Sequence, residues 1–230
     1  PFLIPFLFAM AIGPKLKWIK SNLQNKSYLF LFLVTSFLLS VLILKNNNVN
    51  FLVNTILITA AFYLFFISLR EFLNKKFVNL SQNISHFGFS LLILSILFNN
   101  IFSTEIITNL KIGESYESEK FKINFENIDQ RNEKNFKAIV GKFNVKNSKG
   151  IVEILKPELR IYNQPNIVTS EADIKTNLLT DRFMTMNYVQ NQDYFNIRYQ
   201  TKPFMLWIWL SVLLMSFGGL ISLLQKRHEN

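Results

Sequence analysis

Four long apolar runs constrain this chain more than any other feature of its sequence. They cover residues 28–44, 51–69, 84–102 and 204–224, and each approaches the length of about 20 residues that a helix needs to cross roughly 30 Å of hydrocarbon. Runs of this length predict membrane-spanning α-helices. A shorter run at residues 1–12 is interpreted as the remnant of a fifth span. Because the sequence begins at Pro1 without an initiator Met, we expect a fragment that lacks its N-terminal part.

Charge placement predicts which side of the membrane each segment faces. The formal net charge is +10, but residues 103–203 hold 15 Lys or Arg against 13 Asp or Glu, so most of the surplus flanks the spans. Basic residues dominate segments 13–27 and 70–80 and the tail 225–230, whereas segment 45–50 has one Lys. By the positive-inside rule the three basic segments are cytoplasmic. This distribution gives no support to nucleic-acid binding.

The same rule divides the chain into parts. Residues 1–102 are predicted to form transmembrane helices, the first truncated and the next three complete, and residues 204–224 form the final one. Residues 103–203 lie outside the cytoplasm, in a periplasm or intermembrane space, and residues 225–230 form a cytoplasmic tail. We therefore expect a membrane protein, an α-helical transmembrane bundle with one extracytoplasmic all-β domain.

Residues 103–203 have the pattern of β-strands. In KFKINFENI, Phe121, Ile123 and Phe125 alternate with polar residues, which is the period of a half-buried strand. The segments FKAIVGKFNV, GIVEIL, ELRIY and YFNIRY have similar β-branched and aromatic content, and turn residues at 147–150 predict a hairpin. About 100 residues with roughly six short strands fit a small sandwich or an open barrel.

Candidate anchoring residues lie just before the final span and in its first turns. Pro203 is expected in the first turn of its helix, because an N–H at that position would have no hydrogen-bond acceptor within the helix and proline has no N–H. Trp207 and Trp209 follow near the outer interface, which indoles prefer. Arg198 and Lys202 lie just before the span, and we expect these four side chains to serve as interface or anchoring residues in contact with membrane lipid.

Small residues recur close to one face of the last two spans, and such faces predict close helix packing. They are Ser81, Ser85, Gly88 and Ser95 in one span, and Ser211, Gly218, Gly219 and Ser222 in the other.

His86 is, tyrosines aside, the one ionisable residue inside an apolar run. A helix that enters hydrocarbon near residue 84 places His86 a few Å deep in the cytoplasmic half at ~1.5 Å per residue, and an intramembrane ionisable group is a functional candidate by default. A neutral imidazole there fits a packing residue hydrogen-bonded to a neighbouring helix or to Ser90. It fits equally a ligand or proton relay, of which a haem axial ligand is one version. The residues alone leave these alternatives open.

Other catalytic chemistries find little support in the sequence. The chain has no Cys, residues 103–203 contain no His for a Ser-His-Asp arrangement, and no Gly-rich phosphate loop is present. The second histidine, His228, follows Lys226 and Arg227 and is expected in a solvated tail.

Four motifs, in order along the chain, resemble those of one family. The first motif is a proline-bounded span followed by a basic loop, which PFLIPFLFAMAIGPKLKW resembles. The second is a His-x-Gly helix start, which NISHFGFSLLIL resembles with His86 and Gly88 in place. LKPELRIYNQPNIVTSEADI resembles an outer-domain segment, and IRYQTKPFMLWIWL with GGLISL a closing stretch. The family is CcmF of cytochrome c-type biogenesis. The other matching residues are Pro157, Glu158, Arg160, Tyr162, Glu171, Ile174, Arg198, Lys202, Pro203, Trp207, Trp209, Gly218 and Gly219.

The resemblance implies the C-terminal part of a membrane haem lyase subunit, which helps to reduce haem and attach it to apocytochrome c. His86 would be one of two axial ligands of a b-type haem, haem b, and the second ligand lies outside this fragment, since no other span here has a histidine. Implied partners are the haem chaperone CcmE, apocytochrome-handling CcmH/CcmI-type subunits and apocytochrome c, with quinol as a candidate electron donor. The implied location is a bacterial inner membrane or the mitochondrial inner membrane.

The family's Trp-rich haem-handling segment is also missing from this sequence, so we do not expect the fragment to be active alone. Its parent is either a longer chain or, as in some mitochondria, a protein encoded in separate pieces. An alternative of a different class is a non-catalytic, membrane-anchored β domain that acts as an assembly or interaction module, with His86 as a packing residue. A transporter subunit is less favoured, because no pair of broken helices is visible.

Overall fold

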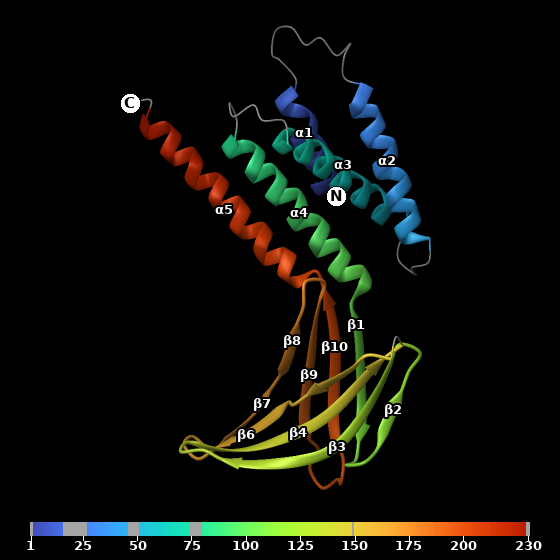
Figure 1. The fold of residues 1–230 in the computed structure, drawn as a ribbon, viewed down its shortest axis with the longest axis vertical. Helices are drawn as coiled ribbons and strands as arrows, with labels where there is room; N and C mark the ends of the chain where they lie inside the picture. The colour runs from blue at the N-terminus through green and yellow to red at the C-terminus, as the bar shows by residue number, and fades with distance from the viewer. Residues whose placement is uncertain (1, 16–26, 46–50, 74–79, 149, 229–230) are drawn as a thin grey trace. The chain divides into compact units, whose positions relative to one another are not determined.

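The computed structural model describes residues 2–15, 27–45, 51–73, 80–148 and 150–228 and contains two compact units (Figure 1). One unit comprises Pro1–Ile101 with Phe204–Asn230, and the other is Phe102–Pro203. The first is helical and the second is built from strands. The fold class expected from the sequence, a helical membrane bundle with one all-β domain, is therefore confirmed.

The helical unit contains five described α-helices. They are α1 (Leu3–Ile12, followed by the 3-10 turn η1, Gly13–Lys15), α2 (Ser27–Leu44), α3 (Phe51–Leu73), α4 (Leu80–Phe102) and α5 (Met205–His228). All but α1 are long and apolar enough to cross a membrane, and the chain is an integral membrane protein. Several helices continue past the apolar runs, because backbone hydrogen bonds extend into the polar turns at the ends. The basic segments 16–26 and 74–79, used above to predict sidedness, lie outside the described residues.

Helix α3 is the best covered of the four long helices. Half of its most apolar 18-residue window is buried, against 11% for α5. Its small residues Ala60 and Ala61 belong to one buried cluster with Leu7 and Ala11 of α1, and small side chains allow helices to approach closely. On its α2 side, the Thr59 hydroxyl shares a buried hydrogen bond of 2.8 Å with the hydroxyl of Ser40.

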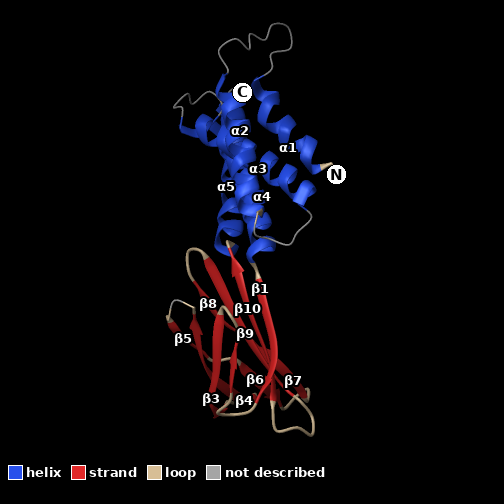
Figure 2. Ribbon diagram, turned by 90° about the vertical axis from the view of Figure 1, so that its right-hand side faces the viewer, coloured by secondary structure: helices blue, strands red, loops and turns tan. Residues whose placement is uncertain are grey.

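The strand unit is a sandwich of two antiparallel sheets, with strands drawn in red in Figure 2. One sheet has the order β1-β10-β9-β8, and the other has the order β2-β3-β4-β6-β7 with β5 paired to β4. The strands are β1 (Thr104–Leu110), β2 (Ser115–Glu117), β3 (Phe121–Asn132), β4 (Phe136–Asn147), β5 (Val152–Leu155), β6 (Glu158–Tyr162), β7 (Ile167–Glu171), β8 (Asp173–Thr176), β9 (Thr180–Tyr188) and β10 (Phe195–Pro203).

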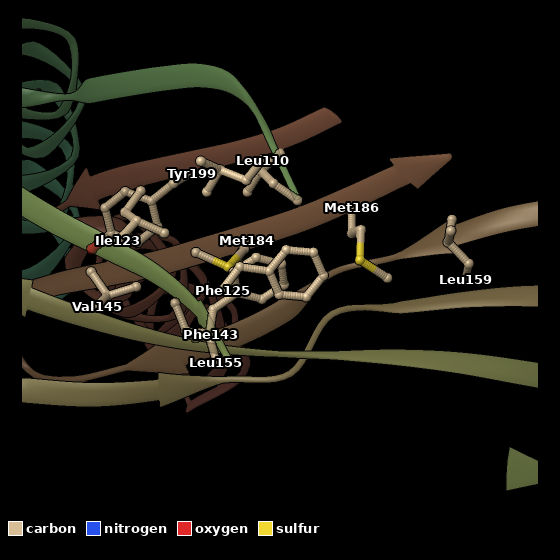
Figure 3. Close-up of a cluster of buried hydrophobic side chains, with 11 residues drawn as sticks. Leu110, Ile123, Phe125, Phe143, Val145, Leu155, Leu159, Met184, Met186 and Tyr199 are labelled. Carbon is tan, nitrogen blue, oxygen red and sulfur yellow. The ribbon is translucent and has the colours of Figure 1, made fainter. Parts of the chain in front are cut away.

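The core of the sandwich is formed by both sheets and contains two stacked phenylalanine rings (Figure 3). Phe125 of β3 and Phe143 of β4 lie 4.3 Å apart between ring centroids, in the same buried cluster as Met184 and Met186 of β9. A Cβ added at Gly141 would lie 2.6 Å from Cε2 of Phe143 and 2.8 Å from Sδ of Met186. A side chain at position 141 would therefore require the Phe143 ring or Met186 to shift in an interior that is already close-packed.

Several strand predictions are confirmed. Ile123 and Phe125 are buried and Phe121 is partly buried, as the alternation predicted. The turn at 147–150 joins β4 to β5, with the Asn147 amide donating to the carbonyl of Ile151 and Gly150 at a φ of 80°. The sequence did not indicate β1, β2, β7, β8 or β9.

The prediction for Pro203 is wrong. Pro203 is the last residue of β10 and pairs with Thr180 of β9, while α5 begins only at Met205. Phe204 between them has a φ of 61°, a left-handed conformation that interrupts both strand and helix. A proline is tolerated at the end of a strand, where the ladder stops and its missing N–H removes little.

Truncation of a core ring tests the sandwich. Phe143→Ala should lower the free energy of unfolding of the β domain by about 3–5 kcal/mol, because the deletion leaves a cavity beside Phe125. Resistance of the reconstituted chain to proteolysis across a urea series measures the change. Val168→Ala, on a side chain that is 60% exposed, is the matched control and should leave the midpoint unchanged; equal midpoints for the two variants would contradict this core.

Candidate functional site

His86 lies in the second turn of α4 and is half-buried. Residues seven and eleven positions later share a helical face with it, and these are Ile93 and Leu97. Both pack against the buried cluster of α1 and α3 that includes Leu7 and Leu64. Helical periodicity therefore places His86 on the side of α4 that faces α1 and α3.

Aromatic rings flank His86 in the sequence and tie this part of α4 to its neighbours. The ring of Phe87 stacks on Phe72 of α3 at 5.6 Å between centroids and also approaches Phe65 at 5.5 Å. On the other flank, Phe89 makes an edge contact of 5.9 Å with Phe6 of α1. The backbone that carries His86 is thus held on both sides by ring contacts, which are directional as well as apolar.

Polar groups lie one turn away from His86 in both directions. The Asn83 side-chain amide approaches the Glu71 carbonyl of α3 at 3.5 Å. Ser90 is fully buried, and its hydroxyl donates to the backbone carbonyl of Phe87 at 2.8 Å. The Ser90 proton is therefore used within α4, and its oxygen keeps the capacity to accept.

The opposite face of α4 packs against α5 through small residues, for each of which the sequence predicted close packing on another helix. The Ser81 hydroxyl donates to the Gly218 carbonyl at 2.8 Å. A Cβ at Gly218 would lie 2.9 Å from the backbone nitrogen of Ser85, and one at Gly88 would lie 3.0 Å from that of Met215. Both glycines are required by backbone proximity, whereas Gly219 has open space around it. This packing fixes the rotation of α4, and with it the direction in which His86 points.

The four predicted anchoring residues divide between β10 and α5. Arg198 donates to the Glu105 carboxylate of β1, and Lys202 is paired in register with Asp181 of β9. Trp207 is half-buried and Trp209 is 65% exposed in the first turns of α5. Arg198 thus has a partner within its own sheet, and an anchoring role for these four side chains stays a prediction.

Two hydrogen bonds lower the pKa of Glu105, the acidic partner of Arg198. Gln200 donates to Glu105 at 2.8 Å, and Arg198 donates to the same oxygen. The Gln200 bond first, and the Arg198 bond after it, hold the pKa of Glu105 below its ordinary value, since both favour the charged form.

Strand β6 gathers residues of the outer-domain motif into an ion-pair cluster. Glu158 accepts from Arg160 at 3.0 Å and from Arg131 of β3 at 3.2 Å, and the hydrogen bond with Glu158 is the main cause that raises the pKa of Arg160. The Arg160 guanidinium also lies 5.0 Å from the Phe136 ring centroid. The sequence did not identify Arg131 or Phe136 as members, because neither is near Glu158 along the chain.

Substitution of glycines tests the α4–α5 packing. Gly218→Ala should destabilise the helical unit by about 1–3 kcal/mol, because the added methyl group meets backbone atoms that cannot move aside. The measurement is the thermal midpoint in detergent by circular dichroism. Gly219→Ala is the matched control and should be neutral or slightly stabilising, because alanine favours a helix more than glycine does and the position has open space. An equal loss at both positions would contradict a specific backbone contact at Gly218.

The Glu105 interactions predict a pH effect with a defined sign. A lowered pKa in the folded state stabilises the domain at pH values above the ordinary pKa of glutamate, and this contribution is lost as the pH falls through the lowered value. Gln200→Leu should therefore raise the pKa of Glu105 and shift acid unfolding of the domain to higher pH. A 13C NMR titration of labelled glutamate measures the shift, and an unmoved Glu105 resonance in the variant would refute the assignment.

The comparisons with known proteins agree with this architecture. Residues 101–203 match the family described as the CcmF C-terminal beta-sandwich. The cytochrome c-type biogenesis protein CcmF of Escherichia coli (strain K12) is 22% identical over 99% of this chain and 36% of its own length. Its counterpart in Haemophilus influenzae is 26% identical over 98% of this chain and 37% of its own length. The chain thus spans little more than a third of these relatives.

Two further similarities cover the sequence and the fold. The cytochrome c-type biogenesis protein ccl1 of Rhodobacter capsulatus is 32% identical over 55% of this chain and 19% of its own length. A solved structure titled Cytochrome c Heme Lyase CcmF superimposes with a TM-score of 0.70 at 19% identity, covering 94% of this chain and 38% of that one, which shows a shared fold. Residues 101–203 thus match the CcmF C-terminal beta-sandwich, and the four apolar helices together with these relatives support a C-terminal portion of the CcmF family.

Proposed function

We propose that this chain is the C-terminal part of a membrane haem lyase subunit for cytochrome c maturation, in which His86 is one axial ligand of a b-type haem. The observation that carries the proposal is the position of His86. It lies on the face of α4 that turns towards α1 and α3, in a helix held by aromatic contacts on one side and by small-residue packing on the other.

The residues around His86 fit such a group by their chemistry. A neutral imidazole is a standard axial ligand of haem iron, and the described residues contain no cluster of three or more His, Cys, Asp or Glu that would favour a different metal. Phe6, Phe65 and Phe72 supply an apolar aromatic surface near the adjoining residues of α4. The haem would contribute one-electron redox chemistry, and its second ligand would come from a part of the protein outside this chain.

The protein's contribution is to hold the imidazole in one orientation and at low dielectric. Close contact of Gly88 with Met215 prevents α4 from rotating away from α5, while the contacts of Phe87 prevent it from separating from α3. A fixed ligand direction and a dry setting are the means by which a protein tunes an axial ligand, together with the hydrogen bond made by the other imidazole nitrogen.

The β domain would face the periplasm or the mitochondrial intermembrane space, with the helices in a bacterial or mitochondrial inner membrane. In this arrangement apocytochrome c is the substrate, and CcmE and CcmH/CcmI-type subunits are the partners that deliver haem and apocytochrome. Quinol is the proposed source of electrons for haem reduction. The near balance of basic and acidic residues in 103–203 supports an aqueous compartment for this domain.

Replacement of His86 tests the ligand role. In the complete protein that carries this chain, His86→Gly should remove or loosen the b-type haem, measured as haem content per protein and as the reduced absorption spectrum. Added imidazole should restore the spectrum, because a free ligand can occupy the space left by the deleted side chain.

His228→Gly is the control, since it removes the other histidine of the chain, at the end of α5, and should leave haem content unchanged. Unaltered haem content and spectrum in the His86 variant would refute the ligand assignment. That result would favour the second candidate, a membrane-anchored β domain that serves as an interaction module, with His86 as a packing residue.

A further inference from the structure

The turn between β8 and β9 exposes two leucines side by side. Leu178 is 71% exposed and Leu179 is 61% exposed. Residues 176–180 contain no charged side chain, and the nearest charges are Lys175 and Asp181. The two adjacent side chains thus form a small apolar surface that is mostly exposed at the tip of the hairpin.

The strand register places this tip at one particular end of the sheet. Thr180 pairs with Pro203, and Pro203 is separated from the start of α5 by Phe204 alone. Neighbouring strands lie about 5 Å apart, so the tip lies beside the point where the chain leaves the domain for a membrane helix. Figure 1 shows β8, β9 and β10 side by side within the domain.

The second connection to the membrane leaves from the same end. Helix α4 ends at Phe102, and Thr104, the first residue of β1, pairs with Thr201 of β10, with their hydroxyl oxygens 2.6 Å apart. Both covalent connections to membrane helices therefore lie at the end of the sheet that carries Leu178 and Leu179. Both connections are short, because residue 103 alone separates α4 from β1 and residue 204 alone separates β10 from α5.

Hydrogen bonds within the tip satisfy three of its backbone amides. The side-chain oxygen of Asn177 accepts from the backbone amides of Leu179 at 2.9 Å and Thr180 at 2.7 Å. The Asn177 amide donates to the Thr180 carbonyl. An amide that enters a less polar medium without a partner carries a penalty of several kcal/mol in the extreme case, and these bonds remove that penalty for the three amides.

We propose that Leu178 and Leu179 insert into the lipid interface of the membrane leaflet from which α4 and α5 enter the β domain, and that the β8–β9 tip is a third membrane contact of the domain. Interfacial apolar side chains reach about 5–10 Å into the headgroup and acyl boundary, a depth within the reach of a leucine pair at the tip. Lys175, exposed on β8, lies where an ammonium meets lipid phosphates.

The chain contains no cysteine, so single probes can be placed without removing native residues. The chain carrying Leu178→Cys or Leu179→Cys is labelled with an environment-sensitive fluorophore and reconstituted alone into nanodiscs of phosphatidylcholine and phosphatidylglycerol. Both probes should show blue-shifted emission and several-fold stronger quenching by brominated lipids than a probe at Ile112. Ile112 is the matched control because it is 54% exposed and lies beyond the opposite end of β1.

A probe at Leu213, exposed on α5, must be quenched in the same preparation and reports that the helix is inserted. Water-like emission and no quenching at both tip positions, with Leu213 quenched, overturns the proposal and would leave a protein partner as the occupant of the tip. Equal quenching at Ile112 also overturns it, because the lipid contact would then not be specific to the tip.

Discussion

Hydrocarbon offers no hydrogen bonds to a polypeptide, and the helical part of this protein is organised around that constraint. Buried hydroxyls bond to carbonyls one turn back, as Thr55 does to Phe51 and Ser68 does to Leu64, or to another helix, as Ser40 does to Thr59. Helix association then depends on close contact instead of exclusion of water, which explains why glycines and serines mark the α4–α5 contact. An imidazole in this setting is conspicuous, because it can be satisfied only by a specific partner.

Long apolar runs and strict alternation could be predicted from the sequence because each is a local property of the chain. The sequence did not indicate β9, although Met184 and Met186 are fully buried, since Met and Thr between polar residues give a weak strand pattern. Pro203 was assigned to the wrong element because propensity favours a helix start, whereas pairing with a strand twenty-three positions away decides its place. The surroundings of His86 come from three other helices and were not accessible to reasoning along the chain.

Family membership and geometry place different limits on function. The family accounts for a sandwich domain between apolar helices, but it does not require that any one helix be held rigidly. The structure adds that α4 is restrained on two faces, by Met215 and Gly218 of α5 and by Phe65 and Phe72 of α3. Restraint of this kind is expected for a helix that must present one side chain in a constant direction. The ion-pair cluster on β6 restrains the outer domain through partly exposed charges, and ion pairs that water reaches contribute less.

The pairing of Thr104 with Thr201 has a consequence for how the helical part assembles. Seen from the membrane, the β domain is a loop of roughly a hundred residues between two helices, and the entropy lost on closing a flexible loop grows with its length. Once the sandwich has folded, its first and last strands are neighbours, and the effective loop shrinks to the few residues on either side. The folded domain therefore brings the end of α4 and the start of α5 close together, before the small-residue faces of the two helices make contact.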